Sequence, residues 1–364
     1  MGWLYDGEMH RGAEDPMLAV LARVAPGAPL REGLDRVLQS GKGGLIIIGD
    51  GPDVLNICSG GFLLDAAFSP QRLSELAKMD GAIILAADAS RIARANVHLV
   101  PNPNVPTTET GTRHRTAERV ARSIAVPVIA VSESMERIAV YLGDEKHQLE
   151  TPPRLLNRAN QALQTLERYR TRLDEVSSSL GALEVEDLVT VRDVVGVLQR
   201  TELVIRISDE IDRAIVELGV DGRLVQLQLE ELTRGVEDDR RLVIADYFQE
   251  DTSWHLDEAM SALAGLATEQ LLDLETVAGA LHLPDDAAGL DSPLTPRGNR
   301  LVARLPRLSP ILRSRIVEHF GSLPKLLRAS AEDLLVVDGM IDLQARAVAD
   351  GLARLAESSI LDRY

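Results

Sequence analysis

Residues 79–134 read MDGAIILAADASRIARANVHLVPNPNVPTTETGTRHRTAERVARSIAVPVIAVSES. Within this stretch, 81–87 and 128–132 are apolar almost throughout, which is typical of strands covered on both faces. Further short apolar or β-branched runs lie at 45–49, 97–100 and 139–142. Helical stretches alternate with these runs, so residues 17–150 predict an α/β domain with a mixed sheet flanked by helices.

The part of this stretch that carries chemistry is Glu109–Arg119, ETGTRHRTAER. A loop with Gly111 leads directly into a predicted helix, Ala117–Ile124, and backbone N–H groups at a helix start attract anions. Arginine pairs phosphate oxygens bidentately, so the side chains of Arg113–Arg115 would complete a positive pocket of triphosphate size. The same spacing also fits an ordinary helix start with Thr112 as its cap, and spacing alone favours neither interpretation.

A second polar element, Lys78–Ala82, stands at the mouth of the apolar run 81–87. The carboxylate of Asp80, beside Gly81, could hold a divalent metal or take a proton from a substrate hydroxyl. An Asp-Gly pair before a strand is more often a simple turn. Asp80 therefore predicts a site only in combination with the cationic loop.

In their order and separation, these two elements resemble the signature motifs of the diadenylate cyclase family. The Asp-Gly-Ala motif is Asp80–Ala82, and the Arg-His-Arg motif is Arg113–Arg115, preceded by an intact Gly111-Thr112. The likeness runs through the whole quoted stretch, and with the helical segments described below it covers residues 17–364. It implies a nucleotidyltransferase that condenses two molecules of ATP into cyclic di-AMP, with Mg²⁺ or Mn²⁺ as cofactor.

The resemblance also implies roles for individual side chains. Asp80 would bind the metal ion and help to deprotonate the ribose 3′-hydroxyl, Leu99 would pack on the adenine, and Ser132 would lie near the phosphates. Glu133 is a weaker candidate for the metal ion. The catalytic residues would be Asp80, Arg113, His114 and Arg115, and the nucleotide-binding residues would be Asp80, Gly81, Ala82, Leu99, Gly111, Thr112, Arg113, His114, Arg115 and Ser132. Each subunit would hold one ATP, so two cyclase domains must face each other, and the family assembles as homo-octamers.

A boundary at Thr151–Pro153 separates the α/β pattern from a helical one. Apolar residues recur at alternating spacings of four and three along Leu155–Leu180, which predicts a helix with a coiled-coil type of stripe. The serines and glycine of 177–181 predict its weak end, and a second helical stretch covers 188–218. Residues 151–288 therefore predict an all-α stalk, whose stripe would contribute to the octamer.

Residues 285–296 are rich in Pro, Asp and Gly and predict a linker into an all-α C-terminal domain at 289–364. Between Arg297 and Arg328 there are eight basic residues against one acid, Glu318, although the whole chain carries a net charge of −17. Two helix–turn–helix units here resemble a tandem helix-hairpin-helix domain, which binds DNA phosphates without reading sequence. The candidate DNA-binding residues are Arg304, Arg307, Arg313, Arg315 and Gly339.

The second hairpin departs from the family's Gly-apolar-Gly pattern, because it reads Gly339-Met340-Ile341 between Asp338 and Asp342. Loss of the second glycine restricts the hairpin backbone, and the two carboxylates repel phosphate. DNA binding would then be weakened or confined to the first unit, and a small helical packing domain is the alternative. In the family, branched DNA bound at this end lowers cyclase output.

Several classes of protein are excluded by composition and motifs. Cys58 is the only cysteine, so internal disulfides and cysteine-based zinc sites are excluded. The apolar runs are too short to cross a bilayer, and residues 1–16 predict a flexible tail without a secretory signal. Residues 41–44, GKGG, lack the spacing of a phosphate-binding P-loop and predict a turn, which argues against an ordinary ATP hydrolase. The sequence thus predicts a cytoplasmic enzyme, and the alternative is a DNA-binding scaffold that senses nucleotide without catalysis.

Overall fold

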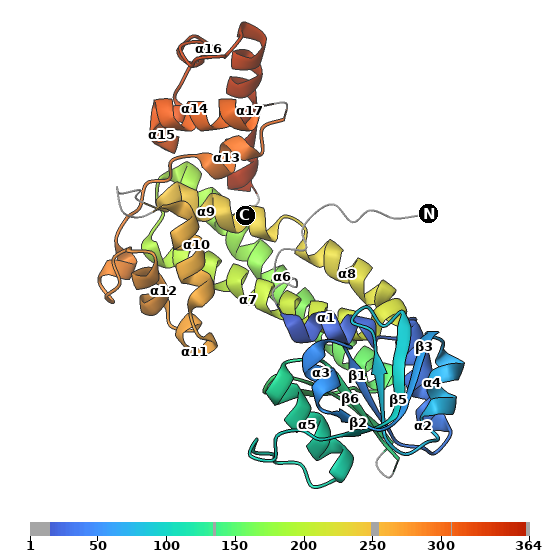
Figure 1. The fold of residues 1–364 in the computed structure, drawn as a ribbon. Helices are drawn as coiled ribbons and strands as arrows, with labels where there is room; N and C mark the ends of the chain where they lie inside the picture. Colours follow the sequence, from blue (N-terminus) through green and yellow to red (C-terminus); the bar gives the residue numbers. More distant parts are fainter. Residues whose placement is uncertain (1–14, 134–135, 249–254, 307, 362–364) are drawn as a thin grey trace. The chain divides into compact units, whose positions relative to one another are not determined.

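The computed structural model describes residues 15–133, 136–248, 255–306 and 308–361 (Figure 1). The chain forms two compact units: unit 1 comprises Met1–Gln161 and Ile211–Leu227, and unit 2 comprises Ala162–Glu210 and Gln228–Tyr364. The helical domain predicted for 151–288 therefore contributes segments to both units. Residues 1–14 of the predicted tail lie outside the described residues. Asp15 and Pro16, by contrast, are the N-cap and first residue of α1 (Pro16–Arg23).

Unit 1 is built on a mixed sheet of eight strands, which confirms the predicted α/β class. The strands are β1 (Gly44–Ile48), β2 (Cys58–Ser59), β3 (Phe62–Ala67), β4 (Ala82–Leu85), β5 (Arg91–Leu99), β6 (Val128–Ser132), β7 (Arg137–Leu142) and β8 (Glu145–Gln148). Their order is β2-β5-β4-β1-β6-β7-β8, with β3 paired to β5. β1 and β4 are parallel, and the other pairs are antiparallel.

Helices cover the two faces of this sheet, and the side chains of each central strand alternate between them. On one face lie α2 (Pro29–Gln39) and α4 (Pro70–Leu76), and on the other α5 (Thr112–Ile124) (Figure 1). Ile46 and Ile48 of β1 pack in the core on the α2 side, whereas Leu45 and Ile47 pack with Val120 of α5. The apolar runs of the sequence are thus strands buried on both faces.

Each of the five predicted strands is present, but three further strands were not predicted. β5 begins at Arg91 rather than at 97, because Arg91 and Arg94 interrupt its apolar pattern and two register shifts in its pairing with β4 break the alternation. β3 has mostly exposed side chains, β8 has the polar sequence EKHQ, and β2 has two residues. Such strands lack the periodic apolar signal on which prediction depends.

The helical remainder of the chain begins with α6 (Pro152–Glu186) and α7 (Val191–Leu218). The predicted weak end at 177–181 is wrong, because α6 continues through it as one helix of 35 residues. Leu155, Leu166 and Leu180 of the predicted stripe are at most 1% exposed within this chain. The stripe is therefore a core element of the chain itself, and its expected contribution to contacts between copies is not supported.

Unit 2 contains most of the remaining helices, in agreement with the predicted all-α class. They are α9 (Val236–Tyr247), α10 (Leu256–Gly265), α11 (Thr268–Leu271), α12 (Leu274–Ala280), α13 (Asn299–Ala303), α14 (Pro310–Phe320), α15 (Leu323–Leu327), α16 (Ala331–Leu334) and α17 (Asp342–Leu361), while α8 (Arg223–Thr233) belongs to both units. The predicted linker 285–296 is anchored, because Leu294 N–H donates to Val189 O at 2.8 Å and Val191 N–H donates to Ser292 O at 3.1 Å.

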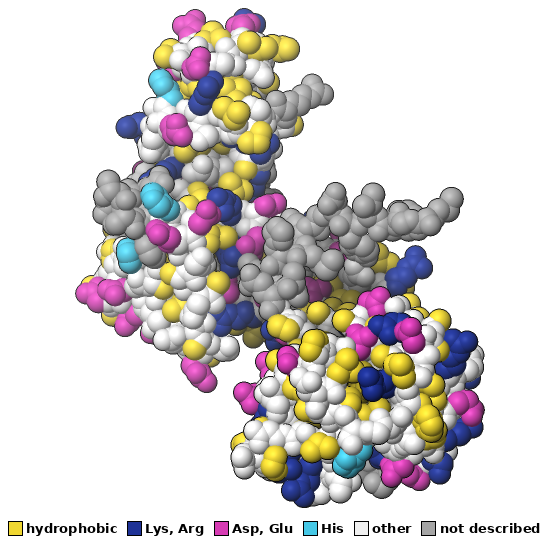
Figure 2. Space-filling model, viewed as in Figure 1, with side chains coloured by type: hydrophobic (Ala, Val, Ile, Leu, Met, Phe, Trp, Pro, Cys, Tyr) yellow, Lys and Arg dark blue, Asp and Glu magenta, His cyan; other side chains and the backbone are white. Residues whose placement is uncertain are grey.

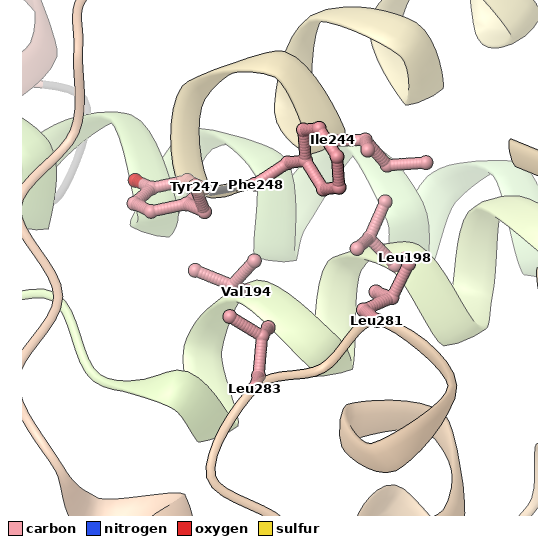
Figure 3. A pocket seen from close by; sticks show the side chains of 7 residues that line it. All are labelled: Val194, Leu198, Ile244, Tyr247, Phe248, Leu281 and Leu283. Carbon is pink, nitrogen blue, oxygen red and sulfur yellow. The ribbon is translucent and has the colours of Figure 1, made fainter. Parts of the chain in front are cut away.

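A small apolar hollow in unit 2 lies between α7, α9 and the segment that follows α12. Its lining is Val194, Leu198, Ile244, Tyr247, Phe248, Leu281 and Leu283 (Figure 3). The Tyr247 hydroxyl donates to Glu184 Oε1 at 2.7 Å, so the lining presents apolar surface and no ionisable group to a ligand. None of the predicted site residues lines it.

One ion pair in unit 1 predicts a dependence of stability on pH. His147 Nε2 of β8 lies 3.0 Å from Glu217 Oε2 of α7. The Glu217 carboxylate raises the pKa of His147 above 6.5, and the charge of Glu150 adds to this effect. Partial burial and the charge of Arg158 lower the pKa but do not outweigh Glu217. A raised folded-state pKa stabilises the protein below the ordinary histidine pKa, and this stabilisation is lost as pH rises through the folded value. We expect the free energy of unfolding in urea to fall from pH 6 to pH 8.5, and this part of the slope to vanish in His147→Gln. An unchanged slope in the variant would assign the pH dependence to other groups.

No helix in the described part of the chain is both long enough and apolar enough to cross a membrane.

Candidate functional site

The predicted nucleotide-binding residues on strands meet at one edge of the sheet. The register pairs Leu45 with Ala82, Ala82 with Val97, and Gly44 with Val131. The starts of β1 and β4 and the ends of β5 and β6 therefore lie together. This edge carries Asp80, Gly81, Ala82, Leu99 and Ser132. Ala82 and Leu99 belong to the core on the α5 side, so the site belongs to the face that α5 covers.

Glycine is required at position 81 because β5 passes close to its backbone. Gly81 has φ +117°, and a Cβ there would lie 2.9 Å from the carbonyl carbon of Asn96. Asn96 itself has φ 55°, at the irregular part of β5. The neighbouring Asp80 is exposed, and its Oδ1 accepts the Gly81 N–H at 3.2 Å. This close packing sets the exposed carboxylate of Asp80 at the mouth of β4.

The Arg-His-Arg motif lies inside the first turn of α5, not in a loop before it. α5 begins at Thr112 rather than at the predicted Ala117, and its N-cap is Gly111, which makes no side-chain cap hydrogen bond. The alternative with Thr112 as cap is therefore wrong. Basic side chains at a helix N-terminus oppose the helix dipole, and this turn contains no acidic residue to balance them. An anion bound to the free N–H groups would offset that cost.

Arg113 connects this helix start to the strand edge. A Cβ built on Gly43 would overlap Arg113 Nη1 and would lie 2.6 Å from its Cζ, so the guanidinium rests on the backbone immediately before β1. Of the turn predicted at 41–44, only Gly41, with φ 62°, lies in a turn, and Gly44 is already the first residue of β1. The contact between Gly43 and Arg113 was not predicted, because the two residues are seventy positions apart in the sequence (113 − 43). The two predicted motifs thus meet at one edge.

His114 is packed against the sheet by an aromatic contact. Its ring lies edge-on to that of Tyr141 of β7, with centroids 6.4 Å apart and an interplanar angle of 75°. Burial, with the charges of Lys146 and Arg113, lowers the pKa of His114, and only Glu109 opposes the shift. His114 is therefore uncharged at neutral pH, unlike the exposed Arg115 beside it. Sequence analysis assigned no role to Glu109, Tyr141 or Lys146.

Within the described residues, no group of three or more His, Cys, Asp or Glu side chains is placed to hold a metal ion. Asp80 and Glu133 are both exposed, the latter in the turn that follows β6. Mg²⁺ is commonly bound by one or two carboxylates together with substrate phosphates. A single carboxylate near a cationic helix start fits that kind of site.

The predicted DNA-binding side chains of unit 2 differ in their surroundings. Arg304 is exposed, Arg313 is half-buried, and Arg307 lies outside the described residues. Arg315 donates to Asp338 O at 2.9 Å and would be 3.1 Å from a Cβ on Gly339, whose φ is +87°. Arg315 of α14 thus lies directly at the predicted second hairpin.

The eight basic residues between 297 and 328 do not all contribute positive charge to the surface. Arg300 is 5% exposed, and its Nη1 donates to Glu184 Oε1 at 2.8 Å. Its contribution to a basic patch is therefore excluded, because a buried guanidinium that is already paired cannot contact DNA phosphates.

Comparison with known families and proteins gives matches over nearly the whole chain. A family model described as DisA bacterial checkpoint controller nucleotide-binding matches residues 31–146, and one described as DisA bacterial checkpoint controller linker region matches 149–289. The DNA integrity scanning protein DisA of Streptomyces coelicolor is 54% identical over 97% of this chain and 95% of that protein. That of Acidothermus cellulolyticus is 53% identical over 97% of each.

Solved structures match less closely. DacA from Staphylococcus aureus, a double mutant, covers 38% of this chain and 91% of that chain at 20% identity, with a TM-score of 0.29. This score is too low to support an argument about the fold.

Proposed function

This chain belongs to the DisA family, and from that premise we propose that it condenses two molecules of ATP into cyclic di-AMP and two pyrophosphates. The observation that carries the proposal is the contact of Arg113 with Gly43, which joins the cationic start of α5 to the strand edge of Asp80. An acid, a set of cations and the N–H groups of the helix start would then face one bound nucleotide.

In the proposed reaction, the ribose 3′-oxygen of one ATP attacks the α-phosphorus of the other and expels pyrophosphate. The reciprocal attack closes the ring. Asp80 would take up the proton of the 3′-hydroxyl, while Arg113, Arg115 and the N–H groups of α5 would neutralise the phosphates. The protein then acts mainly by positioning and electrostatic stabilisation, which phosphoryl chemistry generally requires.

We propose that Asp80 holds Mg²⁺ or Mn²⁺ together with phosphate oxygens of the substrate. The exposed carboxylate and the lack of a larger ligand cluster among the described residues support such a shared site. When bound, the ion would neutralise phosphate charge and lower the pKa of the 3′-hydroxyl.

Because each chain offers one nucleotide site, the reaction requires two copies that face each other. The apolar surface of β3 supports association: Phe62 is 56% exposed and Leu63 is 73% exposed, and β3 pairs with β5, whose end carries Leu99. Figure 2 shows hydrophobic side chains gathered over β3 and β5. Exposed apolar patches of this kind mark interaction sites. We propose a homo-oligomer, with the octamer of the family as the expected size, in the cytoplasm.

For the C-terminal helices, we propose a tandem helix-hairpin-helix module that binds branched DNA and lowers cyclase output. The left-handed glycines Gly321 and Gly339 and the cations Arg304 and Arg315 near the hairpins support contact with DNA phosphates. Asp338 pairs with Arg315, so it is partly neutralised and repels phosphate less than the sequence alone suggests.

Incubation of the purified chain with ATP and Mn²⁺ tests the proposed reaction, with the products identified by mass. We expect cyclic di-AMP and pyrophosphate. Appearance of ADP and phosphate instead would indicate a hydrolase. Tight binding of a non-hydrolysable ATP analogue without any product would indicate a scaffold that senses nucleotide.

Gly43→Ala should weaken ATP binding with little effect on stability. The added Cβ would displace the Arg113 guanidinium, which is flexible enough to move away, and Gly43 does not have a left-handed φ. We expect the KM for ATP to rise about tenfold, the size of one lost charge-assisted interaction. Gly51→Ala is the matched control, because a Cβ at Gly51 meets nothing within 4 Å. An equal KM in both variants would exclude Gly43 from the site.

Arg304→Ala should weaken DNA binding in a salt-dependent way. Loss of one phosphate contact lowers the slope of log K against log salt by about 1, and affinity falls alike for linear and branched DNA. Gel shifts with a four-way junction at several salt concentrations measure this slope. Arg172→Ala, which removes an exposed arginine of α6, provides the control. Equal slopes in the two variants would place Arg304 outside the DNA contact.

A further inference from the structure

Glu109 joins three segments around the start of α5. Its Oε1 accepts hydrogen bonds from the Tyr141 hydroxyl of β7, at 2.9 Å, and from the ammonium of Lys146 on β8. Its own N–H donates to Thr107 Oγ1 at 3.1 Å. The Glu109 side chain is 16% exposed and that of Lys146 is 46% exposed, so the bond from the buried Tyr141 is better shielded from water than the bond from Lys146.

The same tyrosine forms the wall behind His114. Tyr141 is 1% exposed, and its ring is the one that His114 meets edge-on. Lys146 Nζ lies 5.7 Å from the centroid of that ring, so Glu109 and the ring hold the ammonium together. The bond to Glu109 fixes the position of the phenol oxygen. The buried ring of Tyr141 is the surface that the His114 imidazole meets.

The protonation states of Tyr141 and Glu109 agree with the direction of the hydrogen bond between them. Burial raises the pKa of Tyr141, as does the Glu109 carboxylate, so the phenol keeps its proton and donates it. Burial alone would raise the pKa of Glu109, but the bonds from Lys146 and Tyr141 outweigh it and lower the value. Glu109 is therefore an anion that accepts two bonds at neutral pH.

The loop that precedes α5 is fastened independently of Glu109. The buried Glu118 of α5 accepts the Thr108 N–H at 3.1 Å, and Arg119 Nε donates to Val105 O at 3.1 Å. Arg122 Nη1 donates to Pro106 O at 2.7 Å. Removal of the Glu109 charge should therefore leave the loop folded, so Glu109 has a more specific effect than holding the loop in place.

We propose that Glu109, Tyr141 and Lys146 form a positioning network that fixes His114 against the bound nucleotide. The proposal rests on the cyclase function proposed above. His114 would touch the substrate, as Arg113 and Arg115 would, and the three network residues act through His114. A displaced imidazole should slow the chemical step more than it weakens ATP binding, since Arg113 and Arg115 still hold the phosphates.

The kinetics of the Glu109→Gln and Tyr141→Phe variants test whether the network affects the chemical step more than ATP binding. Both variants preserve shape while removing the charge or the hydroxyl. We expect kcat for cyclic di-AMP to fall on the order of 10- to 100-fold, the range seen for small misplacements of a reacting group. The KM and the affinity for a non-hydrolysable ATP analogue should stay within about threefold, a difference of less than one lost hydrogen bond.

Tyr247→Phe is the matched control, because Tyr247 also donates to a carboxylate, that of Glu184, but in unit 2. It should lose stability and keep kcat. Unchanged kcat in both network variants, or a loss of analogue affinity equal to the loss of kcat, would overturn the proposal.

A second measurement does not depend on turnover. Exchange of the histidine C2 proton for deuterium, followed by mass spectrometry, reports the pKa of His114 in each variant. Glu109 raises that pKa, whereas Lys146 lowers it. Glu109→Gln should therefore lower the His114 pKa and Lys146→Met should raise it. Shifts in the same direction, or no shift, would mean that the two charges do not lie beside His114 as the network requires.

These two measurements separate failure of the network from failure of the function. If the unmodified chain makes no cyclic di-AMP, the proposed function is wrong, and the exchange measurement still decides whether the network controls His114. Opposite pKa shifts would support the network, and equal or absent shifts would contradict it.

Discussion

Asp80→Asn is expected to reduce cyclic di-AMP formation to a trace while nucleotide affinity is partly retained. Asparagine matches aspartate in shape, so the backbone around Gly81, with its φ of +117°, is retained. The amide is neutral, and it can neither take the proton of the 3′-hydroxyl nor hold a divalent ion as a carboxylate does. The start of α5, with Arg113 on Gly43, still offers its N–H groups and guanidiniums to the phosphates.

The rate should fall on the order of 10³-fold, within the range for loss of one proton-transfer group. Product formation in Mn²⁺, measured by mass, gives the rate, and calorimetry with a non-hydrolysable analogue gives the affinity. Asp88→Asn is the control: Asp88 is an exposed carboxylate in the turn between β4 and β5 that accepts bonds from Ser90, and the variant should turn over normally. Normal turnover of Asp80→Asn would remove Asp80 from the mechanism, and lost affinity would make it a binding residue.

The central strands of the sheet could be predicted because their side chains are apolar on both faces. Ile46 and Ile47 are both fully buried, one on each side of β1, and such a run has few alternatives in a folded chain. β3 and β8 could not be predicted in this way. Their stability comes from pairing with β5 and β7, and pairing partners leave no mark in the local pattern.

The same distinction applies to the site. Asp80 and Arg113–Arg115 were found because each is part of a short motif with its own chemistry. Gly43, Tyr141 and Lys146 were not, because they come to the motifs through sheet register and through the packing of α5. Their distance along the chain hides them. Motifs therefore identified the residues that would touch the nucleotide, and only the fold identified those that hold them in place.

The number of basic residues between 297 and 328 did not predict the charge exposed on the folded chain. Arg300 was counted as part of a basic DNA-binding segment, yet it is buried beside Glu184, Asp246 and Tyr247. Asp246 accepts the N–H groups of Gly298, Asn299 and Arg300, which caps the start of α13 from α9. Burial, and to a lesser extent the nearby Glu184, raises the pKa of Asp246 to about 6, although the three backbone N–H groups lower it.

Arg300→Met should therefore destabilise unit 2 strongly. Arg300 donates to Glu184 at 2.8 Å and to Ser177 Oγ at 2.8 Å, and Glu184 is only 3% exposed. Methionine fills similar space but leaves the Glu184 carboxylate buried without a cation. Removal of one partner of a buried pair costs about 3–5 kcal/mol of unfolding free energy. Urea unfolding at neutral pH measures this loss.

The double variant Glu184→Gln with Arg300→Met should recover much of that loss. The glutamine side chain is neutral, so no uncompensated charge remains, and its oxygen can still accept the hydroxyl of Tyr247. Arg315→Met is the control, because its pair with Asp338 is exposed and should contribute less than about 1 kcal/mol. Equal losses in the Arg300 and Arg315 variants would mean that Glu184 takes up a proton or reaches water once its partner is gone. Recovery in the double variant would instead show that the lost unfolding free energy comes from the unpaired, buried charge of Glu184. Arg300 would then stabilise the packing of α13 on α6 and α9, and it would not serve as a contact for DNA.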